Sequence, residues 1–148
     1  MIKIIGIDPD LEKPGICLLC DGKIECVESV KIEMIIEDIP IWASQGYIFA
    51  VENVEAKKTT FKRKGTSDFT HAKIAQDVGK VKGAARIIIK MIEHHGGTVI
   101  LVPPGINSAT KKDAKLFKEI TGFSGRTNED NRDAWAIAMW AYKKEVPK

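Results

Sequence analysis

Cysteine is scarce in this sequence of 148 residues, and its three copies are an odd number. An odd count argues against a disulfide framework and favours a reducing compartment. Cys17 and Cys20 have the spacing of a CxxC pair, but they lie in an expected strand, where residues three apart point to opposite faces. We therefore expect core or half-buried thiols there, and no shared metal or redox pair.

Long apolar runs are absent, so no segment is expected to cross a membrane. The first residues lack the basic region and the cleavage site of a signal peptide. The sequence also lacks repeats, low-complexity tracts and linkers. We therefore expect one domain that spans residues 1–148, is large enough to bury a core, and lies in the cytoplasm.

Charge of one sign is not in large excess, because the formal net charge is only +3. The basic residues are nevertheless concentrated between residues 57 and 64, where five basic side chains occur without an acidic one. Two threonines and Phe61 lie within the same block. This composition is typical of a segment that contacts a phosphate backbone, although a solvated loop is the alternative.

Two segments are apolar on both faces and end in a carboxylate. Residues 2–8 end with Asp8, and residues 47–52 end with Glu52. Segments of this kind form the central strands of a sheet. If the two strands are parallel neighbours, Asp8 and Glu52 meet at the carboxyl ends of the strands, where α/β sheets place their sites.

The remaining pattern predicts a mixed α/β fold. Residues 15–19 and 23–30, joined by an Asp-Gly turn, extend the first strand into an antiparallel meander. A short helix over residues 38–44, with Pro40 near its start, precedes the second carboxylate-ending strand. A long helix is expected over residues 68–95 and a fifth strand over residues 98–102. A third helix follows over residues 108–121, and a last helix begins at about residue 127.

The long helix carries an apolar stripe from Ile74 to Ile92, which is expected to face the core. A second stripe consists mainly of small residues, and includes Gly79 and Gly83. Glycine within a helix costs roughly 1 kcal/mol relative to alanine, so a close neighbour is expected beside this stripe. The sheet, a partner subunit and a nucleic-acid backbone are all compatible with that expectation.

The last helix carries two aspartates on a face that becomes apolar. Thr127 has the hydroxyl expected of an N-cap, and Asp130 and Asp133 share a face with Ala134. An unpaired carboxylate at the top of a buried stripe is costly, so Asp133 is expected to meet a cation. A structural interpretation is also open, in which Asp130 completes a capping box and Asp133 pairs with Arg126 or a lysine.

Asp8, Glu52, Asp130 and Asp133 thus come from three elements that can converge. Clustered carboxylates raise one another's pKa values unless divalent cations lie among them. Oxygen ligands favour Mg²⁺ or Mn²⁺ over zinc, and no Cys/His cluster competes for the metal. Two such ions, about 4 Å apart, stabilise the attacking water and the leaving oxygen of a phosphodiester. The layout therefore predicts a metal-dependent nuclease.

Five blocks of sequence follow one another along nearly the whole chain. They are Gly6-Ile7-Asp8-Pro9 followed by Gly15, Val51-Glu52-Asn53-Val54 followed by Ala56-Lys57, Gly79 to Ala85, Val102-Pro103-Pro104, and Asp130 to Ala138. Together they resemble the RuvC-type Holliday-junction resolvases, which are RNase H-like endonucleases that act as homodimers on four-way DNA junctions. The short, lysine-rich sequence is more similar to the phage-encoded members than to the bacterial housekeeping enzyme.

The resemblance implies an RNase H-like α/β fold, in which a five-stranded mixed sheet is flanked by helices. It implies that Asp8, Glu52, Asp130 and Asp133 are catalytic acids that bind two Mg²⁺ ions, with Asp8 as the bridge between them. Lys111 matches a lysine of the family that assists near the scissile phosphate, where a positive charge is stabilising. A homodimer, branched DNA as substrate, and the cytoplasm of a bacterial host for a phage-encoded member are also implied.

DNA contacts are expected from basic residues in three segments and from one aromatic residue. Most of them lie in the basic block, two lie on the long helix, and one follows Lys111. The candidates are Lys57, Lys58, Phe61, Lys62, Arg63, Lys64, Lys80, Lys82 and Lys112.

The sequence departs from the resembled family at three positions. Asp10 replaces a glycine, Asn107 replaces a lysine, and Glu55 replaces an aromatic residue that stacks at the junction. Phe61 or Phe69 is a candidate for that stacking role. These departures predict an altered substrate preference, with little sequence specificity at the cut.

Two other functions remain compatible with the sequence. A different RNase H-like nuclease would act on RNA–DNA hybrids or flaps, and a binding module would shape a junction without cutting it. The four acids argue against a pure binding module, because negative charge near phosphates weakens binding. ATPases of the actin and sugar-kinase type begin with a similar strand, but they need a second domain that 148 residues do not supply.

Overall fold

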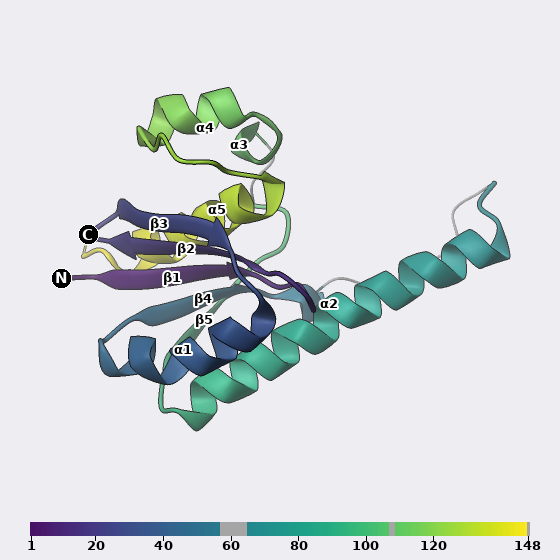
Figure 1. Cartoon of the computed structure of the whole chain (residues 1–148), viewed down its shortest axis with the longest axis horizontal. Coiled ribbons are helices and arrows are strands. Elements are labelled where there is room, and N and C mark those ends of the chain that lie inside the picture. Colours follow the sequence, from purple (N-terminus) through teal and green to yellow (C-terminus); the bar gives the residue numbers. More distant parts are fainter. Residues whose placement is uncertain (57–64, 107–108, 148) are drawn as a thin grey trace.

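The computed structural model describes residues 1–56, 65–106 and 109–147, which form a layered α/β structure (Figure 1). Its strands are β1 (Lys3–Asp8), β2 (Gly15–Cys20), β3 (Lys23–Ser29), β4 (Ile48–Glu52) and β5 (Thr98–Val102). Its helices are α1 (Ile32–Ser44), the 3₁₀ helix η1 (Val54–Ala56), α2 (Asp68–His94), α3 (Ala109–Lys112), α4 (Ala114–Thr121) and α5 (Glu129–Glu145). None of the described helices combines the length and the apolar character needed to cross a membrane.

The described strands form one mixed sheet in the order β3-β2-β1-β4-β5. β1, β2 and β3 are antiparallel neighbours, whereas β4 runs parallel to β1 and β5 runs parallel to β4. This arrangement confirms the predicted antiparallel meander followed by parallel strands. β1 and β4 lie in the interior of the sheet with both faces covered, which explains why their sequences are apolar on both sides.

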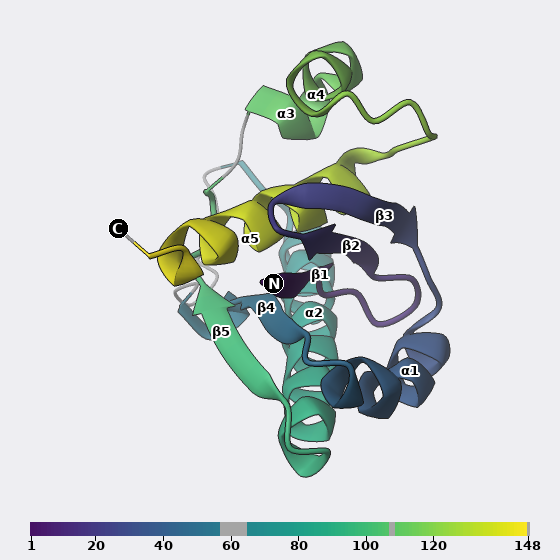
Figure 2. The ribbon, with the colours of Figure 1, turned by 90° about the vertical axis from the view of Figure 1, so that its left-hand side faces the viewer.

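Helices cover both faces of the sheet and create two cores (Figure 2). α1 and the second part of α2 pack on one face, around Ile5, Ile7 and Phe49. α5 packs on the other face, around Ile4 and Leu19. Residues of β1 therefore alternate between the two cores, as the pleat of a strand requires. α3 and α4 lie on the outer side of α5, away from the sheet.

α5 lies directly against β1 and β2 because two glycines leave room for its backbone. A Cβ at Gly6 would collide with the carbonyl oxygen of Ala134, and a Cβ at Gly15 would lie 2.5 Å from the carbonyl oxygen of Asp130. Gly15 is also the residue that pairs with Asp8 across the two strands. The close contact thus fixes the first turns of α5 over the end of β1 that carries Asp8.

α1 begins at Ile32, six residues before the predicted start at residue 38. Ile32, Ile35 and Ile39 are buried and form a stripe at helical spacing. Pro40 lies inside the helix, where it removes one backbone hydrogen bond. The prediction was wrong because the burial of this stripe outweighs the local signal of the proline.

The last helices also begin at residues other than those predicted. α5 is capped by Asn128 and not by Thr127, since the Asn128 side chain accepts a 2.9 Å hydrogen bond from the Asn131 N–H. The Asn131 side chain completes the capping box by accepting from the Asn128 N–H at 2.8 Å, so Asp130 has no part in it. The single helix predicted up to residue 121 is divided at Asp113, whose side chain caps α4.

The first part of α2 extends beyond the rest of the molecule (Figure 1). No residue between 68 and 83 is buried, and Ile74 is 38% exposed, so the predicted apolar stripe faces the core only in its second part. Among the described residues, nothing lies within 4 Å of a Cβ placed on Gly79 or Gly83. The sheet is therefore not the close neighbour that these glycines predicted.

Candidate metal centre

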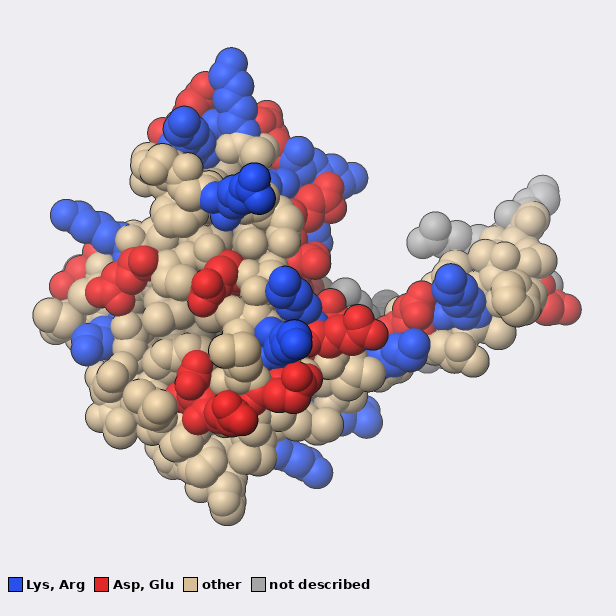
Figure 3. All heavy atoms as spheres, in the orientation of Figure 1, with Lys and Arg blue, Asp and Glu red and all other residues tan. Residues whose placement is uncertain are grey.

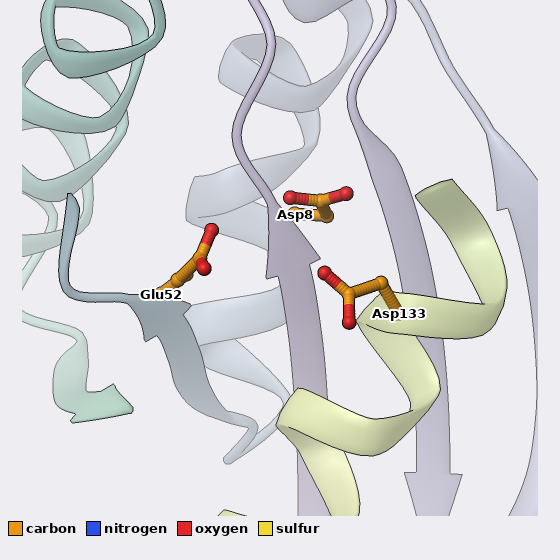
Figure 4. Close-up of side chains that lie close together, drawn as sticks. All are labelled: Asp8, Glu52 and Asp133. Atoms are coloured by element: carbon orange, nitrogen blue, oxygen red, sulfur yellow. The ribbon is translucent and has the colours of Figure 1, made fainter. Parts of the chain in front are cut away.

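Three carboxylates meet at the carboxyl ends of the two central strands (Figure 4). Asp8 ends β1, Glu52 ends β4, and Asp133 lies in the second turn of α5. Each residue offers one carboxylate oxygen, and these oxygens lie within 4.8 Å of one another. Figure 4 shows the three side chains around one shared space.

The register of the sheet explains how Asp8 and Glu52 come together. Ile7 pairs with Val51 in the parallel strands β1 and β4, so the residues that follow both lie at the same edge. Asp133 reaches this edge because α5 packs closely on β1 at Gly6. The predicted convergence of acids from strand ends and a helix start is therefore present.

Asp130 lines the same cavity, although it does not belong to the tight group of three. The cavity has a volume of about 280 Å³ and is lined by Asp8, Pro9, Asp10, Glu52, Val81, Lys111, Asp130 and Asp133. Asp130 is exposed, whereas Asp133 is only 7% exposed. Asp10, one of the departures from the resembled family, adds a further carboxylate to the lining.

The pKa of Asp8 is raised by its burial and by the acids around it. Burial and the nearby carboxylates of Asp133, Glu52 and Asp130, in that order, raise the pKa of Asp8 from 3.8 to about 8. Lys111 lowers this pKa but does not offset the other effects. Burial and the neighbouring carboxylates together thus disfavour the charged form of Asp8.

Lys111 is the cation that Asp133 was expected to meet. Its Nζ lies 3.6 Å from Oδ2 of Asp133. Burial lowers the pKa of Lys111, but the carboxylates of Asp133, Asp8 and Asp130 together raise it above its ordinary value. The lysine therefore remains charged at the edge of the acidic cavity. This pairing by itself is the structural interpretation of Asp133, and it leaves Asp8 and Glu52 to be explained.

A divalent cation fits the donor set of this group. Asp8, Glu52 and Asp133 offer oxygen atoms alone, which suits Mg²⁺ or Mn²⁺ rather than zinc. The raised pKa of Asp8 indicates negative charge that a bound cation would stabilise. The cluster is thus consistent with a metal site.

Arg132 is a buried residue of the site region that the sequence did not single out. Its guanidinium is hydrogen-bonded to backbone and hydroxyl oxygens, among them the carbonyl oxygen of Lys111. It lies next to Asp133 on α5 and is only 6% exposed. A basic residue inside an acidic helix start looks like a solvated side chain, so its burial left no signal in the sequence pattern.

The predicted DNA-binding residues are only partly covered by the described ranges. Lys57, Lys58, Phe61, Lys62, Arg63 and Lys64 lie outside them, as does Asn107. Lys80 and Lys112 are exposed, and Phe69 is 81% exposed near the start of α2. Figure 3 shows acidic side chains where the base of α2 meets the body of the molecule, and basic side chains beside them and over α3 and α4.

Glu55, one of the expected departures from the resembled family, forms an ion pair with Arg86 of the long helix α2. Arg86 Nε donates to Glu55 Oε1 at 2.5 Å, and both side chains are exposed. This ion pair links η1 to α2. Exposed pairs of this kind add little stability.

Comparison with known proteins finds relatives by structure and not by sequence. No family model and no curated protein matches the chain. The structure of RuvC from T. thermophilus in complex with a Holliday junction substrate superposes with a TM-score of 0.62, at 20% identity, over 97% of this chain and 95% of that chain. A second structure of Thermus thermophilus RuvC gives a TM-score of 0.60, at 18% identity and the same coverage of both chains. The chain therefore has the RNase H-like fold of RuvC.

Proposed function

We propose that this chain is a single-domain, Mg²⁺-dependent endonuclease that resolves four-way DNA junctions and cuts related branched DNA. The observation that carries the proposal is the group of Asp8, Glu52 and Asp133 at the edge of an RNase H-like sheet. The fold shared with RuvC, including the structure solved with a Holliday junction, supports the choice of substrate.

The four acids hold the metal in this proposal. When bound, two Mg²⁺ ions, or Mn²⁺ in their place, activate water and stabilise the leaving oxygen of the phosphodiester. Asp8 would be the central ligand of the set, because Asp133, Glu52 and Asp130 all lie close enough to raise its pKa. Glu52, Asp130 and Asp133 complete the ligand set from the other sides of the cavity.

Lys111 and other basic residues of the chain bind the phosphates in this proposal. The ammonium group of Lys111 lies at the edge of the cavity, where it offsets the charge of the scissile phosphate. Lys80, Lys82, Lys112 and the basic block of residues 57–64 contact the flanking backbone without reading sequence.

A homodimer belongs to the same proposal, because paired cuts across a junction need two sites. We further propose that the chain belongs to the phage-encoded branch of the resembled family and acts in the cytoplasm of a bacterial host. The free thiols of Cys17, Cys20 and Cys26 are compatible with a reducing compartment.

The test compares labelled substrates in Mg²⁺: a four-way junction, a Y-fork, an RNA–DNA hybrid and linear duplex. Wild type should give paired nicks in the junction, and Asp8→Asn or Asp133→Asn should abolish them while junction binding persists. Glu129→Gln is the matched control, because Glu129 is an exposed acid on the first turn of α5 outside the cavity. This control should cut like wild type.

Two outcomes would replace the proposal with another function. Preferential cutting of the hybrid or the fork would identify a different RNase H-like nuclease. Tight junction binding without cutting in Mg²⁺ or Mn²⁺ would identify a binding module.

A further inference from the structure

A buried arginine joins α5 to α3. The Nε of Arg132 donates to the carbonyl oxygens of Thr110 at 3.1 Å and Lys111 at 3.0 Å, and one terminal nitrogen donates to Lys111 again at 2.8 Å. The other terminal nitrogen donates to Oγ1 of Thr127 at 2.9 Å. The guanidinium thus bridges the end of α3 and the residue before the cap of α5.

α3 needs such a partner, because it consists of only four residues. One helical turn is unstable by itself. Its last carbonyl groups receive no hydrogen bond from an N–H group of the same helix. Arg132 donates to two of these carbonyls, so it acts as a C-terminal cap supplied by another element. A planar guanidinium suits this role, since its fixed fork can donate to adjacent oxygens at once.

α5 therefore contacts Lys111 at its backbone and at the end of its side chain. Arg132 binds its backbone carbonyl, and Asp133, the next residue of α5, lies 3.6 Å from its ammonium group. We propose that Arg132 is a positioning residue that sets the place of Lys111 in the cavity. This inference rests on the proposed nuclease function, in which Lys111 faces the scissile phosphate.

The test is a double-mutant cycle in junction cleavage. Lys111→Ala should lower kcat by about 100-fold, the usual effect of removing one preorganised stabilising charge. Arg132→Met keeps the apolar stem and should lower kcat to a similar extent with little change in KM. The double variant should be no slower than Lys111→Ala, because Arg132 acts only through Lys111. Arg132→Lys should recover part of the rate.

Arg126→Met is the matched control, since Arg126 is exposed and lies outside the cavity. Multiplying losses in the double variant, or an unchanged kcat in Arg132→Met, would overturn the inference. If Arg132→Met does not fold, Arg132→Lys takes its place in the cycle, and a loss of kcat there that multiplies with the loss of Lys111→Ala overturns the inference.

Amide hydrogen exchange separates this inference from the proposed function. Arg132→Met or Arg132→Lys should speed exchange in residues 109–116 of the full chain and leave β1 and β4 unchanged. Unchanged exchange in residues 109–116 would overturn the inference even if wild type cuts junctions. A wild type that never cuts would remove the proposed function and with it the catalytic purpose of Arg132, whatever the exchange data show.

Discussion

Asp8 is a residue on which the rest of the site acts strongly. Its pKa of about 8 arises from burial and from three neighbouring carboxylates. In the metal-free protein Asp8 therefore holds a proton at neutral pH, and a cation that binds there must displace it. Metal binding and proton release are coupled at this one side chain.

This coupling predicts how the stability of the metal-free protein depends on pH. The unfolded chain loses the Asp8 proton near pH 3.8, whereas the folded chain keeps it until about pH 8. Between these values the unfolded state binds fewer protons, so the stabilising contribution is complete below pH 3.8 and is lost as the pH rises toward 8. Thermal unfolding in chelator should show Tm falling over this window.

Asp8→Asn should flatten the decline, and Glu129→Gln should retain it. Added Mg²⁺ should raise the Tm of wild type more at pH 8 than at pH 6, because fewer protons then compete for the site. A slope that Asp8→Asn leaves intact would show that another group causes the decline.

Single residues differ in how far the sequence could predict their place. Asp8 and Glu52 could be predicted, because apolar strands fix both their positions and their common edge. Arg132 could not, because its partners include backbone carbonyls some twenty residues away, and backbone acceptors leave no mark in a sequence. The cap of α5 was misplaced by one residue, since Thr127 and Asn128 can both cap a helix.

At the scale of elements, the contact between α5 and β2 decides where the acids lie. A Cβ at Gly15 would lie 2.5 Å from the Asp130 carbonyl oxygen and 2.8 Å from the Asn131 nitrogen. Gly15→Ala should therefore push the first turn of α5 away from the sheet and destabilise the fold by about 1–3 kcal/mol. Calorimetry should show weaker Mg²⁺ binding as Asp130 and Asp133 move from Asp8. Unchanged Mg²⁺ affinity would mean that the turn relaxes without moving these acids.

For the glycines of α2 we predict the opposite effect on stability. Gly79→Ala and Gly83→Ala meet open space among the described residues, so each should stabilise the helix by roughly 1 kcal/mol. Circular dichroism during heating should show the gain. A gain in stability accompanied by weaker junction binding would show that the close neighbour of these glycines comes from outside the chain. A loss of stability would contradict the open surroundings of both positions.

Element boundaries were predicted least well where tertiary contacts override local signals. Pro40 marked a helix start in the sequence, but three buried isoleucines draw α1 back to Ile32. The periodicity of α2 predicted one continuous buried stripe, yet the first part of the helix extends beyond the ends of the strands and is not covered. Sequence periodicity indicates which face is apolar and does not indicate how far the covering layer extends.

At the scale of the whole molecule, the proposed paired cutting predicts that two subunits act on one junction. Mixing wild type with Asp133→Asn in equal amounts, under conditions that allow exchange, should make about half of the dimers mixed. These mixed dimers should nick one strand of a junction and leave its partner intact, which a supercoiled cruciform plasmid detects as nicked circles. Linear product in proportion to the wild-type subunits alone would argue for independent monomers.

The sheet order was predictable although no sequence relative is found. A meander, a helical crossover and a second central strand leave few topologies open, because crossovers between parallel strands have a fixed hand. RuvC structures with 18% and 20% identity share the resulting fold. The similarity lies in the order of the strands and in the spacing of the elements along the chain. A comparison of residue identities detects neither.

The two parts of α2 differ in their local stability against unfolding. Residues 68–83 contribute no buried side chain to either core, so the outer turns can melt without disturbing the cores, whereas Val81 lines the acidic cavity. A protease should therefore make its first cuts there, and leave the inner turns with the sheet as a resistant fragment. A partner that binds these outer turns must also order them. Its binding should therefore show a favourable enthalpy offset by an unfavourable entropy, as in coupled folding and binding.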